Sequence, residues 1–218
     1  MIPEINELIG MFCKGTGAEI GGGVNRYMPK AIQIDKFIKD NPDSSTYADI
    51  QADACSIPLE SNSLDFIFSA HCLEHISNPI RALFEWKRIL KDDGFMFLLL
   101  PHYQRMFDRR RKITLLSHCV DDYQSPVEPD YSHNGEITEG WYGQERNEIE
   151  EKDFEKAYGF SPLNFEERVK HGVIHYHVWT QNEIVELMQF INMDIVFVSE
   201  YCSRPDSFIV IGRKERKE

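Results

Sequence analysis

The stretch AEIGGGVNRYMPKAIQIDKF, residues 18–37, decides the fold. A short apolar segment that carries Glu19 runs into three glycines at residues 21–23, and a second apolar segment ends in Asp35. Glycines directly after a strand let the backbone turn sharply and approach a ligand, because no Cβ stands in the way. An acid at the tip of the next parallel strand lies beside that ligand and can accept ribose hydroxyls. The stretch therefore predicts a nucleoside-binding turn.

The residues after the glycines narrow the choice of ligand. The dinucleotide fingerprint opens a helix whose N-terminus holds a pyrophosphate, and a P-loop needs Gly-Lys-Ser/Thr. Here Pro29 stands six residues beyond Gly23 and leaves little room for a long helix. S-adenosylmethionine, which carries an amino acid part and a ribose, fits this arrangement better than a nicotinamide dinucleotide does. A tight turn that binds nothing would also explain the glycines.

The next segments predict alternating strands and helices. Residues 49–54 indicate a third strand, residues 64–70 a buried fourth and residues 95–100 an apolar fifth. Asn78-Pro79 is typical of a helix start between the last two. Continuous apolar strands occur in parallel sheets covered on both faces. The pattern therefore predicts a doubly wound α/β fold.

With these pieces in place, the chain resembles the class I S-adenosylmethionine-dependent methyltransferases of the small-molecule type. The matching segments are EIGGG (19–23), QID (33–35), DA (53–54), LDFIFSAHCLEHI (64–76) and LKDDGFMFLLLPH (90–102). The resemblance implies a mostly parallel, seven-stranded, Rossmann-like sheet in the order 3-2-1-4-5-7-6, with helices on both faces and an insertion after strand five. One departure is that Val24-Asn25 stands at the family's third glycine position.

The resemblance also implies S-adenosylmethionine as the cofactor and a role for each matching position. Gly21 and Gly23 are expected under its methionine part, Asp35 at the ribose hydroxyls, and Asp53 with Ala54 at the adenine. As single residues, both acids could equally end a strand or a turn. The expected cofactor contacts, of which the last three lie beside the sulfonium, are Glu19, Gly21, Gly22, Gly23, Asp35, Asp53, Ala54, Ser69, Ala70 and His71.

Composition sets the class of protein and of partner. A chain of 218 residues, 42% hydrophobic, can bury one core, so we expect a single domain over residues 1–218. Its net charge of −12 argues against nucleic acid, which requires a basic face. The chain lacks a long apolar run and a signal peptide, so we expect a cytoplasmic enzyme with no membrane contact. Its five scattered cysteines are expected to be reduced thiols that bind no zinc.

Residues 103–177 differ from the rest of the chain. They are rich in proline, acids, histidine and aromatic residues, and they leave from the carboxyl edge of the sheet, where open α/β folds bind ligands. We expect a substrate-covering insertion with short helices, for example over residues 148–156, and a possible homodimer contact. The aromatic residues that we expect to serve the acceptor are Tyr123, Tyr131, Trp141, Tyr142, Tyr158 and Phe160.

Three histidines are candidates for the catalytic base that an alcohol acceptor requires. His71 and His102 follow the fourth and fifth strands, and His118 stands beside Asp121 and Asp122 in the insertion. We favour His102, because the sheet fixes its backbone and alignment is most of what methyl transfer needs. The His118 group could hold a divalent cation with another ligand, but loop residues of this kind are mostly solvated, and we expect no metal.

The acceptor is indicated by a second, narrower resemblance. Residues 107–123 and 175–180 are similar to methyltransferases of bacterial surface-polysaccharide biosynthesis. This implies O-methylation of a sugar, a nucleotide sugar or a phosphorylated small molecule. Four arginines in residues 105–112 could bind a phosphate, or could simply form a solvated helix face. The alternative function is a non-catalytic, methyltransferase-like subunit that acts as a binding partner.

Overall fold

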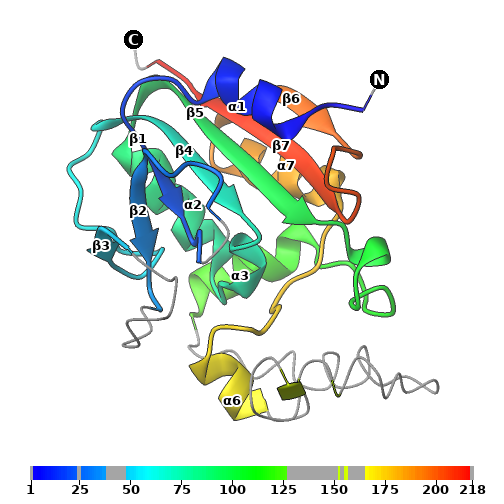
Figure 1. The fold of residues 1–218 in the computed structure, drawn as a ribbon. Coiled ribbons are helices and arrows are strands. Elements are labelled where there is room, and N and C mark those ends of the chain that lie inside the picture. Colours follow the sequence, from blue (N-terminus) through cyan, green and yellow to red (C-terminus); the bar gives the residue numbers. More distant parts are fainter. Residues whose placement is uncertain are drawn as a thin grey trace.

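One sheet organises the molecule. The computed structural model describes residues 2–23, 26–37, 48–126, 152, 155–156 and 165–216. Within them, seven strands form a sheet in the order β3-β2-β1-β4-β5-β7-β6, as expected (Figure 1). The strands are β1 Gly17–Ile20, β2 Ile32–Asp35, β3 Ile50–Gln51, β4 Leu64–Ala70, β5 Leu90–Pro101, β6 Met193–Ser199 and β7 Ser207–Lys214. The first five run parallel, and β7 is antiparallel to both β5 and β6.

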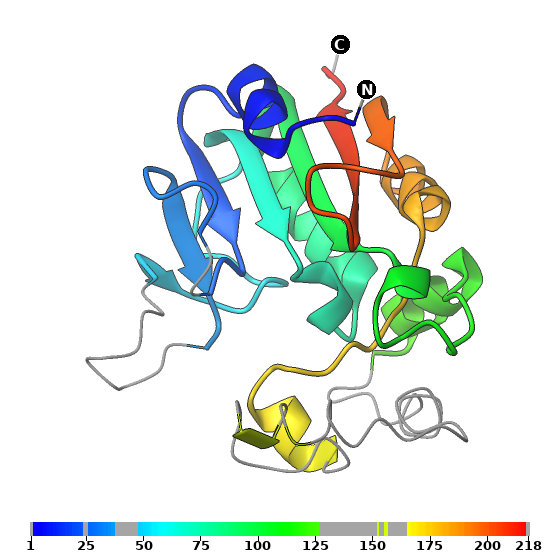
Figure 2. The same ribbon diagram turned by 45° about the vertical axis from the view of Figure 1, so that its right-hand side comes forward.

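Helices cover both faces of the sheet, as the fold class requires. The helices are α1 Ile5–Phe12, α2 Pro79–Ile89, α3 Leu116–Gln124, α6 Phe165–Lys170 and α7 Gln181–Phe190, with 3₁₀ turns η1 Leu73–His75 and η2 Tyr103–Arg105. The apolar side of α1 packs on Phe68 and Phe97 on one face. Helices α2 and α7 pack on the other face with Leu98 and Val210. Figure 2 shows α1 and α7 on opposite sides of the strands.

The sequence patterns set the ends of several elements. Asn78 caps α2 by accepting the backbone N–H of Arg81 at 3.0 Å, and Pro79 follows at the first helical position. The continuous apolar run in β5 is buried from Met96 onward, because β4 and β7 flank it and helices cover it on both faces. No helix within the described residues is both long and apolar enough to cross a bilayer.

Some local predictions differ from the structure. The third strand spans only Ile50–Gln51, and Asp53 lies beyond it in an isolated bridge to Ser56. The fifth strand begins before the predicted residues 95–100: residues 92–94 belong to β5 and lie where its register against β4 shifts. Residues 106–111 form turns rather than a helix. Val24-Asn25, the helix predicted at 148–156 as a whole, and the aromatics between 131 and 160 lie outside the described residues.

Helix α7 provides a test of local stability. Its N-terminal capping box is complete: Thr180 accepts the N–H of Asn182 at 3.3 Å, and Glu183 accepts the N–H of Thr180 at 2.8 Å. We expect Thr180→Ala to lower the free energy of unfolding by about 1 kcal/mol. Chemical denaturation followed by circular dichroism measures this difference. Gln189→Ala, on an exposed position of the same helix, is the control, and an equal loss in both variants would contradict the role of the cap.

Candidate active site

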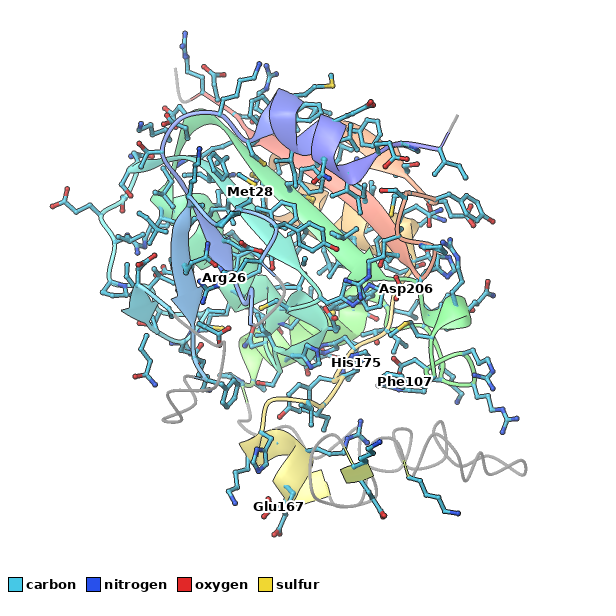
Figure 3. The ribbon with its side chains drawn as sticks, viewed as in Figure 1. Arg26, Met28, Phe107, Glu167, His175 and Asp206 are labelled. Carbon is cyan, nitrogen blue, oxygen red and sulfur yellow. The ribbon has the colours of Figure 1, made fainter. Side chains whose placement is uncertain are left out.

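The candidate site lies at the carboxyl ends of the parallel strands. The chain that precedes α7 passes beneath these ends, between the sheet and α6 (Figure 1). Figure 3 shows His175 of this segment below the strands, with Asp206 above it at the start of β7 and Phe107 to its side. Segments far apart in the sequence therefore meet at one edge of the sheet, as expected for ligand binding in open α/β folds.

The glycine turn is held by a buried acid. Glu19 is fully buried and accepts the backbone N–H groups of Tyr27 and Met28, each at 2.9 Å. Gly21 has φ +72°, and a Cβ there would overlap the side chain of Cys72, so only glycine lets the turn pass so close to the end of β4. A Cβ at Gly23 would meet no atom of the described residues within 4 Å, so among these residues the backbone there faces open space. Glu19 thus shapes the turn from within.

Asp35 joins the turn to the end of β2. Its carboxylate accepts the N–H of Gly23 at 3.2 Å and the N–H of Phe37 at 2.9 Å. The other acid, Asp53, accepts the backbone N–H of Cys55 through Oδ1 at 2.8 Å. Its Oδ2 pairs with Lys36 Nζ, also at 2.8 Å. Burial raises the pKa of Asp53, but the bonds to Lys36 and Cys55 bring it below the ordinary value. Asp35 therefore borders the open space by Gly23, whereas Asp53 is engaged by its own turn and by Lys36.

The end of β4 presents the predicted sulfonium-side residues. Ser69 is buried and its hydroxyl donates to the carbonyl of Ile20 at 3.1 Å, which ties β4 to β1. His71 follows with φ +49°, a left-handed backbone that is uncommon for a residue with a side chain and often marks a functional turn. Its Nε2 lies 2.8 Å from Ser207 Oγ, whose own proton goes to Asp206. His71 Nε2 is therefore the donor in this contact, and its Nδ1 keeps a lone pair.

His71 belongs to what we call the histidine–glutamate cluster, formed by His71, Glu74, His75 and His175. Glu74 Oε1 lies 3.9 Å from His71 Nδ1 and 3.7 Å from His75 Nε2. The rings of His75 and His175 are 4.6 Å apart in an edge-to-face arrangement. Glu74 is only 1% exposed, yet neither carboxylate oxygen accepts a hydrogen bond from any residue that the structure describes. A buried carboxylate without such a partner is rare and calls for an explanation.

Burial sets the protonation of this cluster. It raises the pKa of Glu74 to about 7, with only partial relief from the nearby His175. It lowers the pKa of His71 to about 3 and likewise lowers that of His75, where the neighbouring His175 adds to the effect. Both rings are therefore neutral near pH 7 and offer a basic nitrogen. Shifted pKa values of this kind in a group of facing side chains are typical of a functional site.

A buried ion pair fixes the fourth member of the cluster. His175 Nδ1 lies 2.6 Å from Asp108 Oδ2, and Asp108 pairs with Arg111 at 3.0 Å. Arg111 also donates to the carbonyls of His175 and Tyr176 at 2.8 and 2.7 Å. Residues 107–123 and 175–180, which the narrower resemblance singles out, are thus joined directly. Among the four predicted phosphate-binding arginines, Arg111 is committed to this internal role.

The other two predicted bases lie in different surroundings. His102 is buried, stacks on Tyr103 and meets Phe208 edge-on. Burial lowers its pKa, and the positive charge of Arg105 adds to this shift. His118 lies 3.4 Å from Asp122, whose carboxylate also meets His177 at 3.1 Å. These contacts place His102 and His118 in groups that differ from the one around His71.

Two solved structures share this fold. A methyltransferase from Thermotoga maritima, described as a possible histamine N-methyltransferase, superposes with a TM-score of 0.53 at 17% identity, over 98% of this chain and 90% of that one. A methyltransferase from Methanosarcina mazei gives a TM-score of 0.51 at 16% identity, over 98% and 100% of the two chains. Both are S-adenosylmethionine-dependent by description. At these identities the likeness shows the fold alone.

The sequence comparisons match one part of the chain to methyltransferases. A family model described as a methyltransferase domain matches residues 25–98. The ubiquinone/menaquinone biosynthesis C-methyltransferase UbiE of Campylobacter jejuni strain 81-176 is 31% identical over 80 residues, or 37% of this chain. Residues 25–98 are thus similar to a methyltransferase domain, within a sheet that has the fold of S-adenosylmethionine-dependent methyltransferases. S-adenosylmethionine is the cofactor that these similarities imply, and the glycine turn beside Asp35 fits it. The match spans about a third (32%) of the length of UbiE, so the acceptor of UbiE does not carry over.

Sequence reasoning did not assemble the methyltransferase's cluster or its support. Glu74 and His75 fit the first turn of a helix equally well, and they lie in η1. His175 and Asp108 stand in an insertion whose many histidines and acids give no indication of which will pair. One feature of the sequence could have indicated this cluster: Glu74 and His75 closely follow His71, just after a buried strand. In open α/β folds, ligands bind at the carboxyl ends of such strands.

The ribose contact of the methyltransferase is open to a direct test. Hydrogen bonds to a charged group contribute about 1.5–3 kcal/mol, so we expect Asp35→Ala to weaken S-adenosylhomocysteine binding by at least about tenfold. Isothermal titration calorimetry measures the affinity. Asp194→Ala, which removes an exposed acid paired with Arg213 at the far edge of the sheet, is the control. Equal affinity in Asp35→Ala and wild type would show that the assigned contact is wrong.

Proposed function

We propose that this enzyme methylates a hydroxyl oxygen of a small molecule and that His71 removes the hydroxyl proton. The observation that carries the proposal is the buried cluster, in which a neutral His71 directs the lone pair of Nδ1 toward the carboxylate of Glu74. S-adenosylmethionine supplies a methyl group already activated on its sulfonium. The protein must then align the oxygen, exclude water and accept one proton.

The step balances within this group of residues. A bond forms between the acceptor oxygen and the methyl carbon, the bond from that carbon to sulfur breaks, and S-adenosylhomocysteine remains. The hydroxyl proton passes to His71 Nδ1. Glu74 Oε1, 3.9 Å away, is close enough to stabilise the positive charge that this places on the ring. Ser207, held by Asp206, keeps the other nitrogen of the ring in place.

A saccharide or phosphorylated saccharide is the acceptor class that we propose, in surface-glycan assembly. Support comes from the two segments that resemble surface-polysaccharide methyltransferases, because they are the segments that Asp108 and His175 join beside the cluster. Residues 103–177 would then cover the acceptor. Of the four arginines, Arg105 bonds to the backbone carbonyls of Glu200 and Ser207. Arg109 and Arg110 are exposed, and we assign them to a phosphate of the acceptor.

The rival acceptor is a ring carbon, since the name of UbiE assigns carbon methylation to that relative. The discriminating experiment supplies S-adenosylmethionine with a ¹³C-labelled methyl group and a panel of sugars, nucleotide sugars, sugar phosphates and a quinol. The carbon NMR shift of the product separates an O-methyl from a C-methyl group. An O-methylated saccharide supports the proposal, and methylation of the quinol carbon alone would overturn it.

The base assignment predicts a specific loss of turnover. With the acceptor found in that panel, we expect His71→Ala to lower kcat by roughly 10²–10⁴-fold, the range for a general base. His102→Ala and His118→Ala are the controls and should stay within about tenfold of wild type, because they lie outside the cluster. Calorimetry with S-adenosylhomocysteine checks that each variant still binds the cofactor product. A large loss in His102→Ala, with His71→Ala near wild type, would move the base to the end of β5.

A further inference from the structure

Three members of the histidine–glutamate cluster are arranged as ligands of one ion. A carboxylate oxygen of Glu74 and one ring nitrogen each of His75 and His175 lie within 4.8 Å of one another. They come from the end of β4 and from the segment before α7, so the fold brings together side chains that lie far apart in the sequence. Two imidazoles and a carboxylate form a ligand set that is typical of catalytic metal centres.

In both His75 and His175, the hydrogen bond uses Nδ1, so Nε2 is the nitrogen left for a metal ion. His75 Nδ1 lies 2.7 Å from the carbonyl of Ile174, which can only accept, so Nδ1 carries the proton and Nε2 a lone pair. His175 Nδ1 lies 2.6 Å from Asp108. Asp108 also accepts from Arg111 at 3.0 Å, as a carboxylate does. In the neutral ring that a metal ligand requires, His175 Nε2 then carries a lone pair, and a carboxylate behind a histidine is the usual support of a metal ligand.

The carboxylate of Glu74 gives a second line of support for a metal site, independent of the ligand spacing. It is buried, and neither of its oxygens accepts a hydrogen bond within the described part of the chain. The ring nitrogens beside it are His71 Nδ1 and His75 Nε2, and in each ring the other nitrogen is the one that donates, to Ser207 and to Ile174, so the neutral rings direct lone pairs toward Glu74. A buried carboxylate surrounded by lone pairs is a poor arrangement for protein groups alone, and a cation would satisfy all of them at once.

We propose that Glu74, His75 and His175 bind one divalent first-row transition-metal ion, and that this ion holds the acceptor oxygen next to His71. The ligand set favours zinc, cobalt or iron over magnesium, because two of the three donors are imidazoles. The first half of the proposal stands without any activity, and only the second half rests on the proposed function. An ion at this site would make a bound hydroxyl lose its proton more readily to His71. The sequence analysis expected no metal, and the proposal departs from that expectation.

A second group, His118, Asp122 and His177, also has ligand spacing. In this group the side chains contact one another directly. The same oxygen of Asp122 meets His177 Nε2 at 3.1 Å and His118 Nε2 at 3.4 Å, and His177 stacks on Trp179. The carboxylate there already has protein partners, whereas that of Glu74 has none among the described residues. Variants in this second group therefore serve as matched controls.

The test uses Co²⁺ with the full chain after chelator treatment, followed by visible absorption, with no cofactor and no acceptor present. We expect wild type to bind one ion at this site and Zn²⁺ to displace it. Glu74→Gln and His175→Gln should each weaken binding by at least about 100-fold, and Asp108→Asn by about 10–100-fold, as expected when the support of a ligand is lost. His118→Ala, in the second group, should bind as wild type does. Circular dichroism checks the fold of each variant.

Each outcome decides one claim. Wild-type affinity in both Glu74→Gln and His175→Gln, or loss of the ion in His118→Ala, would overturn the metal site. Glu74→Gln is nearly isosteric and removes an unpaired buried charge, so it is expected to fold. If Co²⁺ binds as predicted but no hydroxyl is methylated, the proposed function fails and the site stands. If metal-free protein methylates a hydroxyl at the full rate, the role of the ion fails and the proposed function stands.

Discussion

The hydrogen bond between His175 and Asp108 is the interaction on which the site depends. It connects the segment that leaves β5 to the segment that enters α7, and Arg111 holds both by bonding to Asp108 and to two backbone carbonyls. The bonds among His175, Asp108 and Arg111 hold His175 under the end of β4. The sheet supplies the edge, and this buried pair brings the polar groups of a distant segment to it.

The cofactor half and the acceptor half of the site are built by different means. The cofactor half is local: Glu19, the glycine turn and Asp35 follow one another within two strands and bond mainly to one another's backbone. The acceptor half is assembled from three places in the chain, each held by side chains that bond to backbone carbonyls or to buried charges. This division explains why the first half resembles other members of the family and the second half does not identify an acceptor.

The same division explains how much the sequence could predict. The strand over residues 64–70 and the start of α2 at Asn78-Pro79 were predicted from patterns a few residues long, and the structure has them. The order of the strands came from the family resemblance and is confirmed. The pairing of His175 with Asp108 crosses 67 residues, and the destination of Arg111 depends on that pairing. Composition showed a cluster of arginines but could not show which charges the protein would use internally.

The position of β7 has a consequence for how the chain is made. β7 is the last strand of the sheet in chain order, yet it lies between β5 and β6 and is buried along most of its length. Until residues 207–214 leave the ribosome, the apolar edge of β5 has no partner on that side, and an unpaired edge of this kind invites pairing with other chains. The nascent protein therefore carries an exposed, aggregation-prone strand from the synthesis of β5 until that of β7, and its folding can finish only after translation has passed β7.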